Sequence, residues 1–274
     1  MEIKTVYAVY FSATGNTRKV VTTLANALAE SFEVPLEVVD FTLPQSRQEQ
    51  YSFAKTDLVV FGTPTYAGKV PNKLLEFVKT GFVGNDAIAV PVVTFGNRSF
   101  DNSLAELCAC LEGEGFHTVA AGAFACQHAF SDVLAAGRPD SDDMTVLAKL
   151  GSAVVGKVGK MTEYPAPIAV DGDASAPYYV PKGLDGQPAK FLKATPKTNM
   201  DKCTNCGVCA SLCPMGSINP ANVAEVTGIC IKCHSCIRNC PEGAKYLDDE
   251  AFLSHKAMLE RDFMRRAEAK IFTE

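Results

Sequence analysis

The stretch VYAVYFSATGNT, residues 6–17, joins a run of apolar residues to a turn and then to a helical pattern. The apolar residues 6–11 predict a buried strand, which ends where serine, threonine, glycine and asparagine take over. From residue 17 to residue 30, apolar residues recur at helical spacing, which predicts a helix. The chain therefore opens with a strand, a tight turn and a helix.

Strands and helices continue to alternate up to about residue 160. Further strands are predicted over residues 36–41, 58–62, 88–95 and 118–125, and further helices over 71–79, 103–111 and 141–157. The strands read as continuous apolar runs, which indicates a sheet covered on both faces. Residues 1–160 are thus expected to form a doubly wound α/β domain with a five-stranded parallel sheet.

The turn after the first strand is a candidate phosphate site. Hydroxyls of Ser12, Thr14 and Thr17 and the backbone N–H groups at a helix N-terminus can surround a phosphate, and Gly15 permits close backbone approach. A simple helix cap is the alternative interpretation. The turn has neither the lysine of a Walker loop nor G-x-G-x-x-G spacing, so nucleoside triphosphates and dinucleotides are disfavoured.

The pattern S-x-T-G-N-T after a first strand, with the order of elements over about 160 residues, resembles the flavodoxin family. This resemblance implies bound FMN, with its phosphate in the turn and its ring between two later loops. The implied cofactor-binding residues are Ser12, Thr14, Gly15, Asn16, Thr17, Pro64, Thr65, Tyr66, Ala67, Gly68, Gly96, Asn97 and Phe100.

Within those loops, Tyr66 and Phe100 are the candidates to flank the flavin ring, because flat aromatic faces stack on it. The backbone of Gly68 is a candidate to approach the N5 edge. The loops are predicted at the carboxyl ends of strands, where open α/β sheets bind ligands. The alternative is that both aromatics simply pack their own loops.

Two features depart from small flavodoxins. The acidic stretch common in that family does not follow Phe100, and a segment from residue 126 to residue 140 extends past the fifth strand. In that segment, His128 is a candidate proton donor if it faces the flavin, or else a solvated loop histidine. Arg138 is expected to bind either an anionic substrate or an acidic neighbour such as Asp140.

Eight of the eleven cysteines fall into two runs with the same spacing. Cys203, Cys206, Cys209 and Cys213 are followed by Pro214, and Cys230, Cys233, Cys236 and Cys240 are followed by Pro241. The C-x2-C-x2-C-x3-C-P spacing is that of bacterial ferredoxins, in which the fourth cysteine ligates the other cluster. The remaining Cys108, Cys110 and Cys126 are expected to pack as small apolar side chains.

This spacing assigns two sets of ligands. Three cysteines on one loop bind three irons of a cube, while the fourth begins a helical turn and reaches the other cube. The first [4Fe–4S] cluster is expected on Cys203, Cys206, Cys209 and Cys240, and the second on Cys230, Cys233, Cys236 and Cys213. Structural zinc is the alternative, although zinc sites usually pair C-x2-C units across a longer gap.

The remaining segments complete the predicted organisation. Residues 161–199 contain six of the fifteen prolines and are expected to be an extended linker against a domain surface. Residues 200–247 are the predicted small α+β two-cluster domain, which should unfold without metal. Residues 248–274 are predicted to form one amphipathic terminal helix, spanning about 250–271.

Composition excludes several classes of protein. The 274 residues predict about two domains, and 47% hydrophobic with 21% charged residues is typical of a globular chain. A net charge of −5 favours neither nucleic acid nor anionic lipid as a partner. With no secretory pattern in the first residues and no apolar run of about 20, we expect a cytoplasmic protein with reduced thiols.

The leading functional hypothesis is an electron carrier that shuttles electrons among FMN, two clusters and a partner redox protein. The alternative is a reductase of a small organic substrate, supplied by its own clusters, with His128 and Arg138 in the substrate pocket. A third hypothesis makes the clusters purely structural. An anaerobic setting is expected, and a homodimer is possible.

Overall fold

The computed structural model describes residues 1–274. Its central sheet has the strand order β11-β8-β6-β4-β1-β2, with the short β7 paired to β6. The parallel strands are β1 (Thr5–Tyr10), β2 (Leu36–Asp40), β4 (Asp57–Pro64), β6 (Ile88–Phe95), β7 (His117–Thr118) and β8 (Ala121–Ala125). The predicted α/β fold class with a mostly parallel sheet is confirmed.

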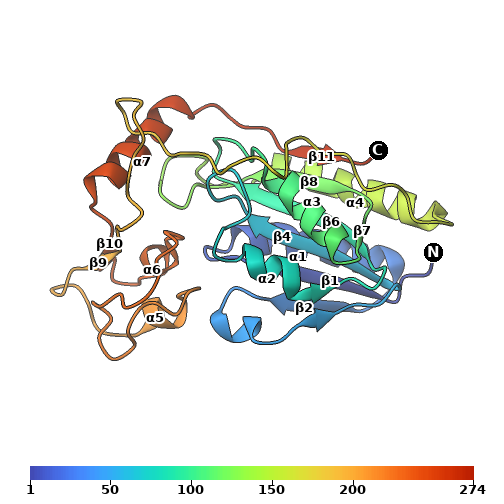
Figure 1. The fold of residues 1–274 in the computed structure, drawn as a ribbon, viewed down its shortest axis with the longest axis horizontal. Coiled ribbons are helices and arrows are strands. Elements are labelled where there is room, and N and C mark those ends of the chain that lie inside the picture. Colours follow the sequence, from blue (N-terminus) through green and yellow to red (C-terminus); the bar gives the residue numbers. More distant parts are fainter.

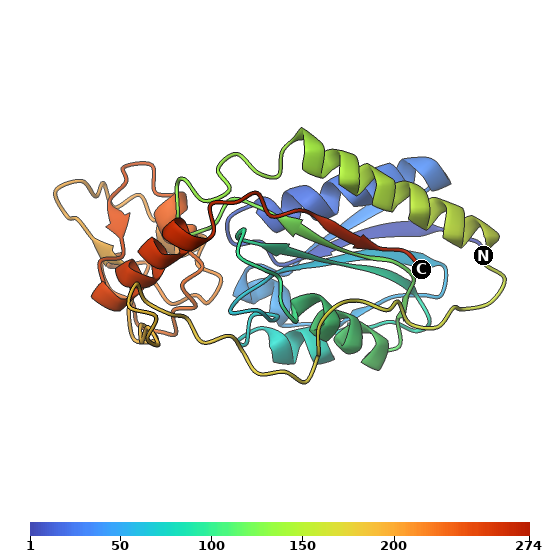
Figure 2. The ribbon, with the colours of Figure 1, turned by 90° about the horizontal axis from the view of Figure 1, so that it is seen from above.

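Helices cover both faces of the sheet, as the continuous apolar strands indicate (Figure 2). One face carries α1 (Asn16–Phe32) and α4 (Ser141–Lys160), and the other carries α2 (Leu75–Thr80) and α3 (Ser103–Gly113). Each face has its own apolar cluster, and the two contain 25 and 24 buried residues, so the sheet is buried on both sides. Cys108, Cys110 and Cys126 are buried in these two clusters.

Smaller elements complete the chain. They are the 3-10 turn η1 (Pro44–Arg47), β3 (Tyr51–Ser52), β5 (Phe82–Val83), β9 (Lys197–Thr198), α5 (Val208–Ser211), α6 (Ser235–Arg238), β10 (Lys245–Tyr246), α7 (Glu250–Asp262) and β11 (Lys270–Phe272). The residues from β9 to β10 and their connections, 196–247, are called here the cysteine segment. It lies with α7 beyond one end of the sheet (Figure 1). No helix is both long and apolar enough to cross a membrane.

The proline-rich residues 161–196 contain no helix or strand, yet they follow the surface of the N-terminal domain. Ile168 is buried in its core, and the backbone N–H of Tyr179 donates to the Ala67 carbonyl at 2.8 Å. The Lys69 ammonium, ion-paired with Glu106 at 2.9 Å, donates to two carbonyls of this segment. The segment is therefore fixed by specific contacts.

The prediction of one terminal helix over residues 250–271 was wrong for its last third. Helix α7 ends at Asp262, and residues 270–272 form β11, which pairs antiparallel with β8. The edge of β8 otherwise presents unpaired N–H and C=O groups, and β11 satisfies them. The parallel sheet thus gains an antiparallel edge strand from the far end of the chain.

A buried ion pair holds the returning segment. The Arg138 guanidinium pairs with the Asp143 carboxylate, with Nε to Oδ2 at 2.9 Å, and donates to the Ala267 carbonyl at 2.6 Å. The side chain of Asp143 is 2% exposed. The expected acidic neighbour of Arg138 is therefore Asp143, while Asp140 pairs with Arg266 at 2.7 Å.

We expect Arg138→Met to lower the free energy of unfolding by about 3–5 kcal/mol, because Asp143 would remain buried without its main partner, with only Arg266 at 3.7 Å. Arg266→Met is the control and should lose much less, since its ion pair with Asp140 is exposed to solvent. Urea denaturation of both variants measures the difference. Equal losses would contradict this account of the returning segment.

Candidate functional site

The phosphate loop, residues 12–17, presents a row of free backbone donors. No hydrogen bond within the protein uses the N–H groups of residues 13–17. Gly15 immediately precedes α1 with a φ of 89°, a conformation that favours glycine. Successive free N–H groups at a helix N-terminus form an anion-binding concavity. The chain therefore has a backbone cradle for a phosphate.

The side chains of this loop divide between structure and ligand. The Ser12 hydroxyl accepts from the Arg18 backbone N–H at 3.0 Å, and the Thr17 hydroxyl lies 2.8 Å from that of Thr94 in the core. Asn16 donates to the Gln127 carbonyl at 3.1 Å. These three side chains thus have protein partners, and Thr14 retains a free hydroxyl. Arg18, which the pattern did not single out, is exposed in the first turn of α1 and can meet an anion there.

The 60s loop, residues 65–69, follows β4 and forms a tight turn. Tyr66 and Lys69 exchange backbone hydrogen bonds at 2.9 and 3.1 Å, and the two residues between them, Ala67 and Gly68, both have positive φ. The Gly68 carbonyl already accepts from the Asn102 N–H at 2.9 Å. A side chain at Gly68 would collide with Asp101, so glycine is required here for packing as well as for φ.

The 90s loop, residues 96–102, is held by protein contacts at most of its predicted flavin positions. The side-chain amide of Asn97 donates to the Phe263 and Arg265 carbonyls at 2.6 and 2.7 Å, and its Oδ1 accepts from the Ala267 N–H at 3.2 Å. The Phe100 ring packs on Phe95, with centroids 5.7 Å apart. The side chain of Asn97 therefore fixes the C-terminal segment, which sequence reasoning missed because the partners are distant backbone groups.

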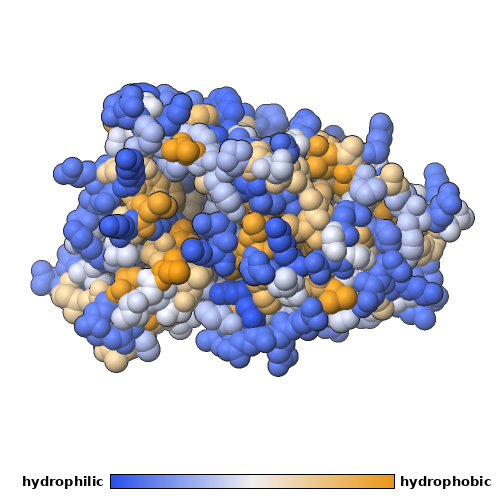
Figure 3. Space-filling view, in the orientation of Figure 1, coloured by the Kyte–Doolittle hydropathy of each residue, from blue (hydrophilic) through white to orange (hydrophobic).

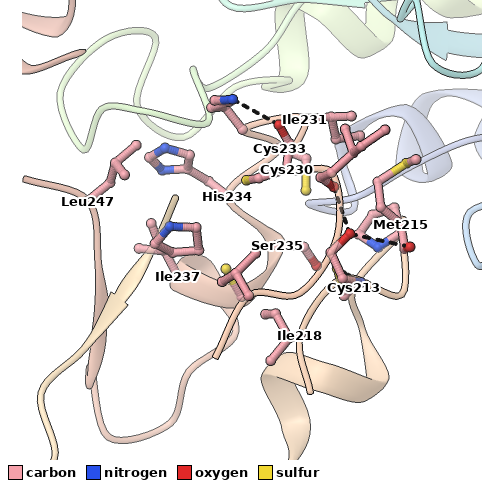
Figure 4. Close-up of a pocket in the computed structure, with 17 residues that line it drawn as sticks. Cys213, Met215, Ile218, Cys230, Ile231, Cys233, His234, Ser235, Ile237 and Leu247 are labelled. Atoms are coloured by element: carbon pink, nitrogen blue, oxygen red, sulfur yellow. Dashed lines mark hydrogen bonds between the residues drawn. The ribbon is translucent and has the colours of Figure 1, made fainter. Parts of the chain in front are cut away.

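The eight cysteines of the two runs line two cavities. The proximal cavity contains Cys213, Cys230, Cys233 and Cys236 in its wall (Figure 4). The distal cavity contains Cys203, Cys206, Cys209 and Cys240. Each cavity thus combines three cysteines of one run with the fourth of the other run.

The donor set of these cavities fits iron–sulfur clusters. Four thiols surround each cavity, and a [4Fe–4S] cluster is held by four cysteine thiolates. The combination of three cysteines of one run with the fourth of the other is the arrangement of two-cluster ferredoxins.

Backbone groups and burial tune these thiols in different ways. The N–H groups of Ser217 and Ala244 donate to the sulfurs of Cys213 and Cys240 at 3.3 and 3.2 Å. Burial raises the pKa of Cys233 and Cys236 to about 12. Iron must displace protons from these two thiols, so cluster binding is expected to weaken in acid.

The proximal cavity lies against the N-terminal domain. Burial raises the pKa of the Tyr66 hydroxyl, and the nearby Cys233 and Cys230 raise it further. Ile231 packs on the core of the N-terminal domain. Apolar side chains gather around a hollow where the two parts meet (Figure 3). The 60s loop and two cysteines of the proximal cavity are therefore neighbours.

Polar contacts also join the two parts. Arg238 of α6 donates to the Ala129 and Ser131 carbonyls at 2.9 and 2.6 Å, and pairs with Asp132. These residues belong to the junction loop, residues 127–134, which follows β8. Cys206, in the wall of the distal cavity, is exposed.

The structure does not support His128 as a proton donor. Burial, together with the positive charge of its neighbours, lowers the pKa of His128 to about 3, so the ring is uncharged at neutral pH. Its Nδ1 accepts from the Phe130 N–H at 3.1 Å. The ring packs on Gly96, where an added Cβ would lie 2.2 Å from it. Both His128 and the buried Arg138 therefore have structural roles in this fold.

Comparison with known proteins agrees with the two-part organisation. Residues 7–95 match the flavodoxin domain model, and residues 196–219 and 227–243 match two 4Fe-4S binding domain models. No curated protein matched the chain. The chain thus has a flavodoxin-like domain at its N-terminus and two ferredoxin-type units at its C-terminus, which imply FMN and two [4Fe–4S] clusters. These matches confirm the resemblance inferred from the sequence.

Several solved structures resemble the N-terminal part. A flavodoxin from the domain Archaea is 16% identical, with a TM-score of 0.40, covering 57% of this chain and 99% of its own. A flavodoxin of Streptococcus pneumoniae TIGR4 is 15% identical, with a TM-score of 0.39, covering 54% and 95%. Rubredoxin oxygen:oxidoreductase from the anaerobe Desulfovibrio gigas is 18% identical, with a TM-score of 0.36, covering 57% and 36%.

Gly15→Ala tests the phosphate loop. The added Cβ would meet only the Arg18 guanidinium, at 3.9 Å, but the backbone is left-handed, so we expect a loss of about 1 kcal/mol in stability. We also expect FMN affinity to fall roughly tenfold, because the N–H cradle must shift. Gly186→Ala, at a φ of 76° in the proline-rich segment, is the control and should lose stability only. Unchanged FMN titration for Gly15→Ala would contradict the assignment.

Removal of iron by a chelator should unfold the cysteine segment and spare the sheet. The segment's own apolar cluster has four buried residues, and two of them are Cys209 and Cys236. Metal binding must therefore supply much of its folding free energy. Amide hydrogen exchange should rise throughout residues 196–247 while β6, in the same sample, stays protected. Retained protection in the cysteine segment would overturn this expectation.

Proposed function

We propose that this protein is an electron carrier in which a flavin site and two cluster sites exchange electrons with a partner redox protein. FMN exchanges one or two electrons, and a [4Fe–4S] cluster exchanges one. The observation that supports the proposal is the order of the sites. The proximal cavity adjoins Tyr66 of the 60s loop, and the distal cavity exposes Cys206.

The residues that hold the groups follow from the two cavities and the loops. We assign Cys213, Cys230, Cys233 and Cys236 to the proximal cluster and Cys203, Cys206, Cys209 and Cys240 to the distal cluster. We assign the FMN phosphate to the N–H groups of residues 13–17, with Thr14 and Arg18, and the ring to the neighbourhood of Tyr66. The distal cluster then faces the partner.

The carrier is favoured over the reductase by the contacts of two residues. A reductase needs a proton donor and a substrate contact above the flavin. His128 is uncharged and packed on Gly96. Arg138 is bound by Asp143, by the Ala267 carbonyl and by the side-chain oxygen of Asn97. The chain offers neither residue to a substrate. All eleven cysteines are free, and with the exposed distal site we place the protein in a reducing, anaerobic cytoplasm.

Metal content tests the ligand sets. Anaerobically purified protein should contain about eight irons and one FMN per chain. Cys213→Ala and Cys240→Ala should each retain about four irons, the first in the distal cavity and the second in the proximal cavity. Iron and sulfide assays with cluster spectroscopy measure this. Two irons or zinc in the parent protein, or loss of both clusters in both variants, would contradict the interleaved sets.

Reoxidation tests the function itself. Photoreduced protein should pass electrons rapidly to a protein acceptor such as cytochrome c and only slowly to small organic acceptors. Cys240→Ala should lose the fast reaction and keep its flavin, because the partner-facing site is gone. Fast turnover with an organic acceptor alone would support the reductase instead.

A further inference from the structure

We propose that His234 is a positioning residue that seats the proximal cavity against the flavin side of the molecule. The inference deepens the proposed function and rests on it. His234 lies between Cys233 and the first residue of α6, and its ring is turned away from the labelled cysteine sulfurs and toward Leu247 (Figure 4). It is therefore placed to act through packing and not as a ligand.

The internal repeat shows that this position carries an unusual residue. Cys206 is followed by Gly207 with a φ of 75°, and the equivalent Cys233 is followed by His234 with a φ of 61°. A left-handed backbone favours glycine, which the first run has. A histidine at the same place strains the backbone, so its side chain must contribute something that the distal site does not need.

The side chain fills an aromatic contact between the two parts. His234 is 7% exposed, and its ring centroid lies 4.7 Å from Phe130 of the junction loop and 5.2 Å from Phe252 of α7. Its Nε2 has no hydrogen-bond partner. The contact is thus one between flat aromatic rings.

The contact continues to the flavin side. Phe130 lies 4.8 Å from His128 between ring centroids, and the His128 ring packs on Gly96 of the 90s loop. Three rings therefore connect the neighbour of a proximal cysteine to a predicted flavin loop. In the distal site, Gly207 offers no such contact, and that site is open to solvent on its Cys206 side.

His234→Gly tests the proposal, because it restores the residue of the first run and relieves the backbone. We expect full iron content, about tenfold slower electron exchange between flavin and clusters after flash reduction, and faster amide exchange in residues 127–134. A tenfold loss of the docked arrangement corresponds to about 1.4 kcal/mol. Asn205→Gly relieves a φ of 54° in the first cysteine run and is the matched control. It should change neither the electron exchange between flavin and clusters nor the amide hydrogen exchange of residues 127–134.

His234→Phe separates packing from the imidazole nitrogen. It keeps a flat ring, so we expect rates of electron exchange and of amide hydrogen exchange close to those of the parent protein. A His234→Phe variant as slow as His234→Gly, or a His234→Gly variant with parental rates, would overturn the proposal. If the parent protein itself shows no electron exchange between flavin and clusters, the proposed function fails. If the parent shows this exchange and His234→Gly shows it at the same rate, only the role of His234 is contradicted.

Discussion

The interleaving of the two cysteine runs is the constraint on which the C-terminal part depends. In each run a four-residue helix, α5 or α6, contains the third cysteine, and the fourth follows just after the helix ends. Cys213 and Cys240 therefore leave their own loops and line the opposite cavities. With so few apolar residues of its own, this part is held by bonds that cross between its halves. Neither run can complete a site alone.

The two cavities are equivalent by sequence but not by surroundings. Arg238 and Ile231, both in the second run, contact the N-terminal domain, whereas the equivalent Ser211 and Thr204 of the first run are exposed. The first run meets that domain only at its end, where the Pro214 carbonyl accepts from Arg47. Packing on the N-terminal domain therefore gives different surroundings to two cavities that the repeated sequence would make nearly equivalent. Potentials of iron–sulfur clusters depend on burial and hydrogen bonding, so the same ligands need not give the same potential.

The sequence was most informative where structure depends on local pattern. The strand over residues 88–95 and the helix that begins at Ser103 lie where their periodicity placed them, and cysteine spacing anticipated the composition of both cavities. Prediction failed where a side chain forms hydrogen bonds to backbone groups that are distant in the sequence. Asn97 belongs to a flavin-type motif, but it binds the carbonyls of Phe263 and Arg265, and no local pattern encodes that contact.

The returning strand β11 changes what kind of fusion this is. The chain leaves the N-terminal domain after α4, builds the cysteine segment and α7, and comes back to finish the sheet beside β8. The cluster-bearing part is consequently an insertion with two anchors, not a module on a tether. A part attached at both ends cannot move freely relative to the sheet to accept and donate electrons. Because both ends of the inserted chain are fixed, undocking would gain less conformational entropy than it would for a part attached at one end. In the proposed function, electrons must then pass to a partner protein that docks at the distal cavity, because the cavity cannot move to the partner.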